Sequence, residues 1–114
     1  MFKVPQVSYS ASSPVLSNKQ QYPYFLRTIA SDINQAQVMS ALTELTHWNY
    51  VAIAHTDDAY GIPGMEALRD NLAARNVCVA FTFGLNRETD DTEVVDFVAR
   101  LKEDSKAQVS FTLW

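Results

Sequence analysis

The chain has 114 residues, of which 47% are hydrophobic and 19% charged, and its formal net charge is −4. This length supports a domain with a real core and is too short for two complete domains. The basic residues are scattered and form no positive cluster, so no nucleic-acid partner is expected. The longest apolar run, residues 77–81, is far below the ~20 residues that cross a bilayer. The first residues also lack the apolar core of a signal peptide.

The N-terminal third predicts two extended segments joined by a loop. Residues 4–9 have the composition of a strand. Residues 10–14 are small and end in proline, which is typical of a loop. Residues 22–29 are aromatic and apolar, and we expect them to be extended after Pro23.

A helix is predicted next. Ser31 or Asp32 can cap its start, and the helical pattern runs to about residue 45. Apolar residues at helical spacing predict the face that packs inward. That inner stripe is expected to contain Ile33, Ala36, Met39 and Leu42.

From about residue 48 the sequence alternates strands with helices. The expected strands are 50–54, 77–81 and 108–113. One helix is expected at 61–75, with Met65, Leu68 and Leu72 on its inner face. Another helix can be capped by Thr89 or Asp90, and its apolar residues at helical spacing are Val94, Val98 and Leu101. This alternation predicts an α/β fold, in which a parallel sheet carries helices on both faces.

Enzyme motifs are not found in the sequence. It contains no G-x-x-x-x-G-K, G-x-G-x-x-G, G-x-S-x-G or H-E-x-x-H pattern. His47 and His55 lack the spacing of shared metal ligands, and we interpret both as structural or surface residues. Asp57 and Asp58 are interpreted as a solvated loop, because a receiver-type phosphoacceptor site needs further acidic residues and a lysine. No enzyme activity, cofactor or metal is therefore predicted.

Polar side chains gather where strands end, which is where open α/β sheets bind ligands. Hydroxyl, carboxylate and aromatic groups of this kind suit a zwitterionic amino acid, whose ammonium group prefers carboxylates and aromatic faces. Each residue also has a structural interpretation, as a turn former, a helix cap or a packing residue. The candidates are Ser10, Ser12, Asp32, Asp57, Asp58 and Tyr60.

Cys78 is the single cysteine, so no disulfide can form within the chain. One interpretation is a small buried side chain in the strand at 77–81. The other is one half of a bridge whose partner lies elsewhere.

Several segments together resemble a known family. They are VPQVSYSASS at 4–13, LSNK at 16–19, FLRTI at 25–29, WNYV at 48–51 and DDAYGIPG at 57–64. From about residue 4 to residue 81 the chain is similar to the extracellular ligand-binding (Venus flytrap) domain of class C G-protein-coupled receptors. The segment 57–64 looks most like the calcium-sensing branch, whereas 9–11 and 55–56 look more like the metabotropic glutamate branch.

The resemblance implies a partial periplasmic-binding-protein-like I fold. Residues 1–26 would end the first lobe, and residues 27–114 would form part of the second. The parent would be a dimeric receptor on the extracellular side of the plasma membrane, coupled to a heterotrimeric G protein. Its ligand would be a small amino acid, with Ca²⁺ as a candidate co-agonist, and cleft closure would drive signalling.

The same resemblance assigns roles to individual residues. Ser12, with Ser10 and its backbone beside it, would contact the amino-acid group of the ligand. Asp32 would help to hold the ammonium, and Tyr60 would close over it. Cys78 would form a disulfide with a cysteine-rich domain further along the parent chain. The family usually has proline before the Ser-Asp pair, and this chain has Ala30 there.

A different protein class shares the bilobed architecture. A periplasmic-type amino-acid-binding protein of a transport system would also suit the turn at Tyr60 and Gly61. The segments 17–19 and 25–28 favour the receptor.

Overall fold

The computed structural model describes residues 3–104 and 108–111. Its elements are β1 (Gln6–Ser8), the short 3₁₀ helix η1 (Pro14–Ser17), β2 (Phe25–Arg27), α1 (Asp32–Leu45), β3 (Tyr50–Thr56), α2 (Gly61–Ala74), β4 (Cys78–Leu85), α3 (Asp91–Glu103) and β5 (Gln108–Phe111). The predicted order of strands and helices is confirmed. Leu113, the predicted end of the last strand, lies outside the described residues.

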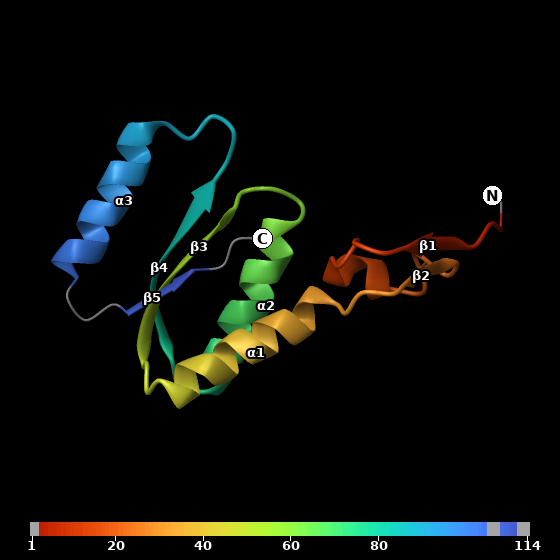
Figure 1. The fold of residues 1–114 in the computed structure, drawn as a ribbon, viewed down its shortest axis with the longest axis horizontal. Coiled ribbons are helices and arrows are strands. Elements are labelled where there is room, and N and C mark those ends of the chain that lie inside the picture. The colour runs from red at the N-terminus through yellow and green to blue at the C-terminus, as the bar shows by residue number, and fades with distance from the viewer. Residues whose placement is uncertain (1–2, 105–107, 112–114) are drawn as a thin grey trace.

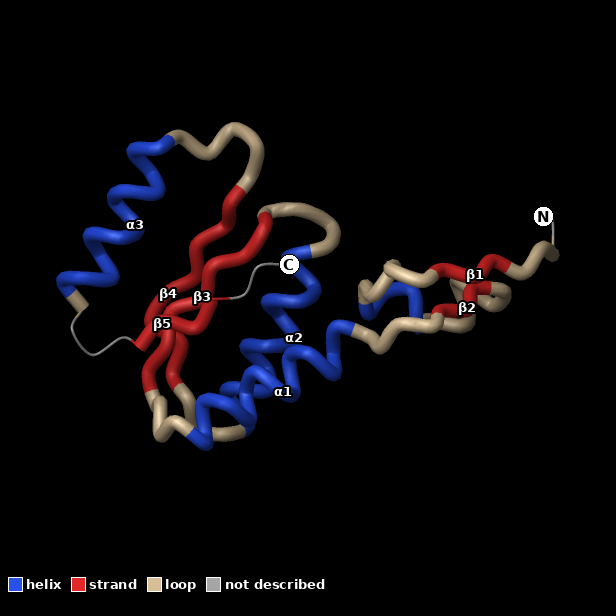
Figure 2. Tube along the Cα trace, viewed as in Figure 1, coloured by secondary structure: helices blue, strands red, loops and turns tan. Residues whose placement is uncertain are grey.

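The main sheet has three parallel strands in the order β4-β3-β5. Helices α1 and α2 lie on one side of it and α3 on the other, as Figure 1 shows. The colouring of Figure 2 makes the same layers visible, with the strands between the helices. The α/β fold predicted from the sequence is therefore confirmed.

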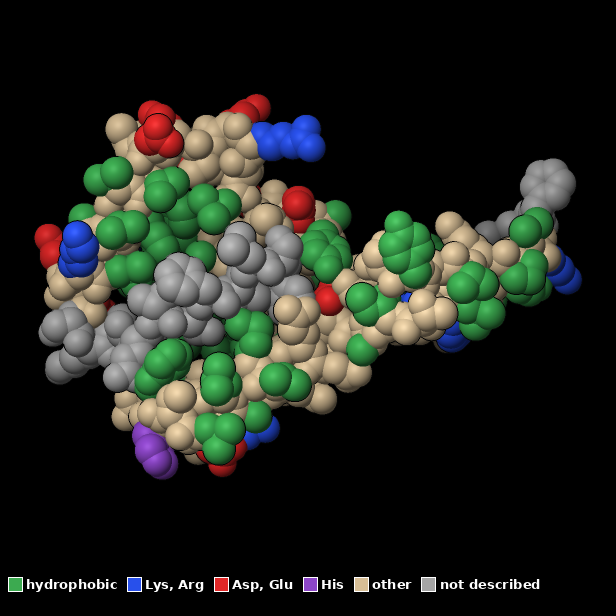
Figure 3. All heavy atoms as spheres, viewed as in Figure 1, with side chains coloured by type: hydrophobic (Ala, Val, Ile, Leu, Met, Phe, Trp, Pro, Cys, Tyr) green, Lys and Arg blue, Asp and Glu red, His purple; other side chains and the backbone are tan. Residues whose placement is uncertain are grey.

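Residues 3–31 form an arm that extends away from the sheet and helices (Figure 1). Within the arm, β1 and β2 pair in parallel, from Gln6 opposite Phe25 to Ser8 opposite Arg27. Hydrophobic side chains are exposed along its surface (Figure 3), among them Val4, Val7, Tyr9 and Leu26. Only Ser12 and Phe25 are buried among the described residues of the arm.

The main core forms between β3 and α2. Val51 and Ile53 of β3 are fully buried. Their side chains are apolar, as is typical of a parallel strand that is covered on both faces. The α2 residues Met65, Leu68 and Leu72 pack against them, so the inner face predicted for this helix is confirmed.

The inner stripe predicted for α1 is only half correct. Ala36 is buried and Met39 packs against the core, but Ile33 and Leu42 are exposed. Buried hydroxyl side chains take the remaining positions on the inner face of the helix. They are Ser40 and Thr43.

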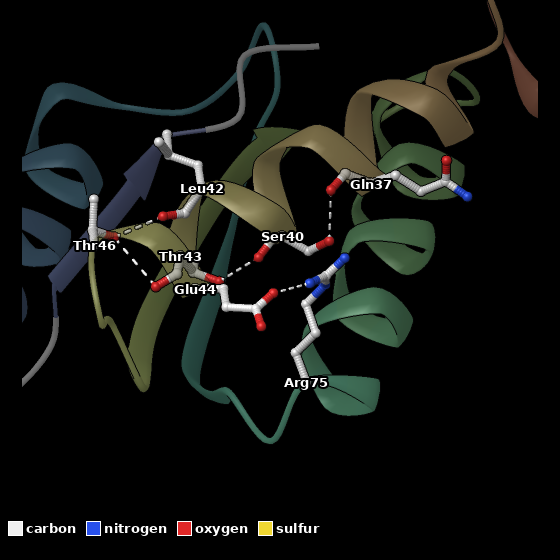
Figure 4. Close-up of polar contacts among 7 residues, drawn as sticks. All are labelled: Gln37, Ser40, Leu42, Thr43, Glu44, Thr46 and Arg75. Carbon is white, nitrogen blue, oxygen red and sulfur yellow. Dashed lines mark hydrogen bonds and ion pairs between the residues drawn. The ribbon is translucent and has the colours of Figure 1, made fainter.

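These hydroxyls can be buried because each bonds within its own helix. The Ser40 hydroxyl donates to the Gln37 carbonyl at 2.9 Å, and the Thr43 hydroxyl donates to the Ser40 carbonyl at 2.7 Å (Figure 4). A buried polar group costs little once it has a partner. An ion pair between Glu44 and Arg75 then joins the ends of α1 and α2 (Figure 4).

The third helix predicted from the spacing of Val94, Val98 and Leu101 is α3, and Phe97 is the residue that it buries. Val94 and Val98 are 37% and 41% exposed, whereas Phe97 is 8% exposed. Phe97 stacks on Phe83, with ring centroids 4.6 Å apart, and meets Phe81 edge to face at 5.6 Å. The face of α3 that packs inward is therefore the one that contacts the aromatic rings of β4.

A β-bulge explains why those rings face α3. Val51 pairs with Val79, but Ile53 pairs with Thr82, so β4 carries one extra residue between these points. Before the bulge, Val79 points toward the core beneath α2. After it, the alternation of β4 is reversed, and Phe81 points to the opposite face.

None of the described helices is long and apolar enough to cross a membrane.

Candidate functional site

Ser12 and Tyr60 meet although 48 residues separate them along the chain. Ser12 lies in the loop after β1, and Tyr60 directly precedes α2. The Ser12 Oγ and the Tyr60 Oη are 2.7 Å apart and share a hydrogen bond. Ser12 is 5% exposed, whereas Tyr60 is 37% exposed and still reaches solvent. This contact joins the arm to the start of α2.

Asp32 lies at the same junction. It is the first residue of α1, and its backbone N–H donates to the Ser12 carbonyl at 3.0 Å. The side chain is 3% exposed, and its Oδ2 atom is buried without a hydrogen-bond partner. The buried hydroxyl of Ser31 also has none. A buried polar atom without a partner costs about 1–3 kcal/mol, so these two oxygens are suited to receive donors from a ligand.

Three of the four predicted ligand-binding residues thus come together, and the fourth, Ser10, lies in the loop beside them with its backbone bonded to Ser8. Ser10 is exposed, and its backbone N–H is 3.4 Å from the Ser8 Oγ. The same Ser8 Oγ accepts the Ala11 N–H at 3.1 Å and so stabilises the turn after β1. Ser10 therefore belongs to the loop that leads to Ser12.

Arg27 supports the loop that carries Ser12, a role that the sequence did not reveal. Its Nη1 donates to the carbonyl oxygens of Ser12 at 3.0 Å and Ser13 at 2.9 Å, and its Nη2 donates to the Ser17 hydroxyl. The one available signal was a lone basic residue within the apolar run at 25–29.

Asp58 caps the N-terminus of α2. Its Oδ1 accepts the Gly61 N–H at 2.7 Å, the Tyr60 N–H at 2.9 Å and the Thr56 hydroxyl at 3.1 Å. The backbone hydrogen bonds from Gly61 and then Tyr60 lower the pKa of Asp58 below its ordinary value. Asp58 is exposed, as a solvated loop residue should be, but it also fixes the backbone that carries Tyr60.

This cap predicts a loss of stability in acid. Because the pKa of Asp58 is lower in the folded chain, the stabilisation is complete above the unfolded pKa of about 4 and disappears as pH falls through the folded value. The melting temperature of the chain, followed by circular dichroism from neutral to acidic pH, should drop in that window. Asp58→Asn should reduce the drop, and Asp57→Asn, one residue earlier, should keep it. Identical profiles for wild type and Asp58→Asn would disprove the capping role.

Cys78 is exposed at the start of β4, so the interpretation of a buried cysteine is wrong. Its backbone N–H donates to the Asn49 carbonyl at 2.9 Å, which aligns β4 with the start of β3. The neighbouring Val77 is 7% exposed and fills the buried position instead.

Comparison with known proteins identifies the family of the chain. The family model described as "Receptor family ligand binding region" matches residues 1–112. The human extracellular calcium-sensing receptor is 39% identical over 109 residues, which cover 96% of this chain and 10% of the receptor. Metabotropic glutamate receptor 4 of Rattus norvegicus is 35% identical over 109 residues, covering 95% of this chain and 12% of that receptor.

The chain spans about a tenth of the length of the curated relatives that it matches. The family match covers nearly all of the sequence, and the resemblance to calcium-sensing and metabotropic glutamate receptors is confirmed. These relatives are receptors and not enzymes, in agreement with the prediction from the sequence. The chain therefore belongs to the receptor ligand-binding region family and corresponds to part of the extracellular ligand-binding region of a class C G-protein-coupled receptor.

Proposed function

We propose that this chain forms part of an amino-acid-binding cleft, and that closure of the cleft drives G-protein signalling by the parent receptor. One observation carries the proposal: the hydrogen bond between Ser12 and Tyr60 lies beside the buried carboxylate of Asp32, which has an unpartnered oxygen. One of the two relatives is named a calcium-sensing receptor and the other a glutamate receptor.

The chemistry of these groups matches the amino-acid end of such a ligand. An ammonium group has three donors and a full positive charge, and it would offer the Asp32 Oδ2 the partner that it lacks. The half-exposed ring of Tyr60 would cover the same cation. Ser12, with the Ser10 backbone beside it, would supply the hydroxyl contact. Ca²⁺ remains a candidate co-agonist.

In this proposal the cleft lies between two lobes. Residues 1–26 belong to the first lobe and residues 27–114 to the second, so Ser12 and Tyr60 lie on opposite sides. Their hydrogen bond then forms across the cleft and belongs to the closed state. A ligand that binds the closed state more tightly than the open one shifts the population toward closure.

The parent is proposed to be a dimer at the plasma membrane that couples to a heterotrimeric G protein. Cys78 is proposed to bridge to a cysteine-rich domain of that parent, and its exposed position is compatible with an external partner. No observation favours the transport-system alternative, since both named relatives are receptors.

Removing either hydroxyl of the Ser12–Tyr60 pair should weaken signalling. Ser12→Ala or Tyr60→Phe, each introduced into the full-length receptor, is expected to raise the EC50 for an activating L-amino acid about two- to tenfold. That range corresponds to the ~0.5–1.5 kcal/mol of a typical net hydrogen bond. The EC50 would be read from a G-protein signalling assay and normalised to surface expression.

Tyr9→Phe is the matched control, because Tyr9 is 85% exposed, and its EC50 should not change. The double variant Ser12→Ala/Tyr60→Phe should raise the EC50 by a factor smaller than the product of the two single factors, because both changes remove the same hydrogen bond. If both single variants kept the wild-type EC50, this site would not be the ligand-binding cleft.

A further inference from the structure

Arg27 is positioned to control the shape of the proposed cleft without belonging to it. It ends β2 and is half-buried, and its guanidinium lies against the backbone of residues 11–13. Residues 11–13 are neither helix nor strand, so the carbonyl groups of this loop have no ladder partners. The guanidinium donates to the carbonyl oxygens of Ser12 and Ser13, in addition to the backbone N–H groups of Asp32 and Leu16 that they accept.

The Ser12 carbonyl oxygen connects two parts of the site. It accepts the Arg27 Nη1 at 3.0 Å and the Asp32 backbone N–H at 3.0 Å. A carbonyl oxygen has two lone pairs, and here both are used. The position of Arg27 is therefore transmitted to the loop that presents the Ser12 hydroxyl and to the first residue of α1.

The second terminal nitrogen of Arg27, Nη2, holds the guanidinium from its other side. Arg27 Nη2 donates to the hydroxyl of Ser17, the last residue of η1. The planar guanidinium can bind the carbonyl groups and this hydroxyl at the same time, because its donors diverge in a rigid fork. A lysine ammonium is a single point on a flexible chain and cannot reach both sets of partners.

We propose that Arg27 is a positioning residue for agonist binding, which acts by holding the loop that presents Ser12. This inference rests on the proposed function, because it gives Arg27 a role only through a Ser12 that contacts ligand or closes the cleft. It goes beyond that function in predicting that potency depends on an arginine fork within the arm. The effect should depend on fork geometry as well as on charge.

The test is a double-mutant cycle in the full-length receptor. The probe is the L-amino acid that gives the strongest response among the standard twenty, at fixed Ca²⁺. Arg27→Lys is expected to raise the EC50 roughly tenfold, with unchanged maximal response and surface expression. In the Ser12→Ala background the same substitution should raise the EC50 less than threefold, because the group that Arg27 positions is already absent.

Two further variants complete the test. Ser17→Ala removes only the anchor of Nη2 and should raise the EC50 about two- to threefold, which keeps the proposal testable if Arg27→Lys fails to reach the surface. Arg87→Lys changes an exposed arginine in the loop after β4 and should leave the EC50 unchanged.

The proposal is overturned if Arg27→Lys raises the EC50 equally in both backgrounds or leaves it unchanged. It is also overturned if Arg27→Lys lowers only the surface expression, because that result indicates a purely structural role. Failure of the proposed function gives a different pattern, in which Ser12→Ala and Asp32→Ala themselves leave the EC50 unchanged.

Discussion

Replacing Asp32 with alanine is expected to lower the agonist potency of the full-length receptor by roughly 10- to 150-fold while surface expression stays intact. The range corresponds to one charge-assisted hydrogen bond of about 1.5–3 kcal/mol to the ligand ammonium. Expression should persist because Oδ2 has no partner in the folded chain. Removing a buried carboxylate oxygen without a partner eliminates a desolvation cost instead of breaking a bond.

Two variants separate this effect from helix stability. Asp32→Asn keeps the size of the side chain and removes its charge, so its potency loss should approach that of Asp32→Ala. Asp91→Ala is the matched control, because Asp91 is also the acidic first residue of a helix, α3, and is exposed. If Asp32→Ala kept the wild-type potency in the same signalling assay, the carboxylate would not be part of the ligand-binding site.

Gly61→Ala is expected to destabilise the chain strongly. A Cβ atom at Gly61 would lie 2.1 Å from the Thr56 carbonyl oxygen and 2.3 Å from the Thr56 Oγ1. Both distances are far inside van der Waals contact, so the start of α2 would have to move away from the end of β3. We expect the free energy of unfolding to fall by about 3 kcal/mol, the upper part of the usual range for overpacking.

Urea denaturation of the chain measures that change, and Gly84→Ala provides the comparison. A Cβ atom at Gly84 would lie 3.1 Å from the Asp57 Cβ, which a small displacement can relieve. Gly84→Ala should therefore cost clearly less than Gly61→Ala. Equal losses would show that the close approach of α2 to β3 is not a strict requirement of the fold.

The sequence predicted the helices and strands well where a side chain's polarity decides its place. Leu68 and Leu72 of α2 are an example, because purely apolar residues at helical spacing have only one favourable environment. In α1 the same reasoning failed, since Ser40 and Thr43 satisfy their hydroxyls within the helix and can be buried. Hydrophobic periodicity gives no information on hydrogen bonds of that kind.

A bulge decides which residue of α3 packs inward, which the spacing of its apolar residues did not indicate. One extra residue in β4 turns Phe81 and Phe83 toward α3, where their rings contact Phe97. Strand register depends on how two strands pair, which local sequence does not specify. The face of α3 could therefore be derived only once the pairing of β3 with β4 was known.

For the site, residue chemistry identified candidates and the family resemblance selected among them. Ser12, Asp32 and Tyr60 are separated along the chain, and nothing in their spacing predicts a 2.7 Å contact between two of them. Arg27 was missed because its role depends on carbonyl groups, which every residue has and no motif records.

The most direct test of the whole account is the response of cells expressing the full-length receptor to each standard L-amino acid at fixed Ca²⁺. We predict that at least one amino acid activates G-protein signalling in a concentration-dependent manner, and that Asp32→Ala shifts that curve to higher concentration. A receptor that reaches the surface and responds to none of them would contradict the claim that this chain forms part of an amino-acid-binding cleft.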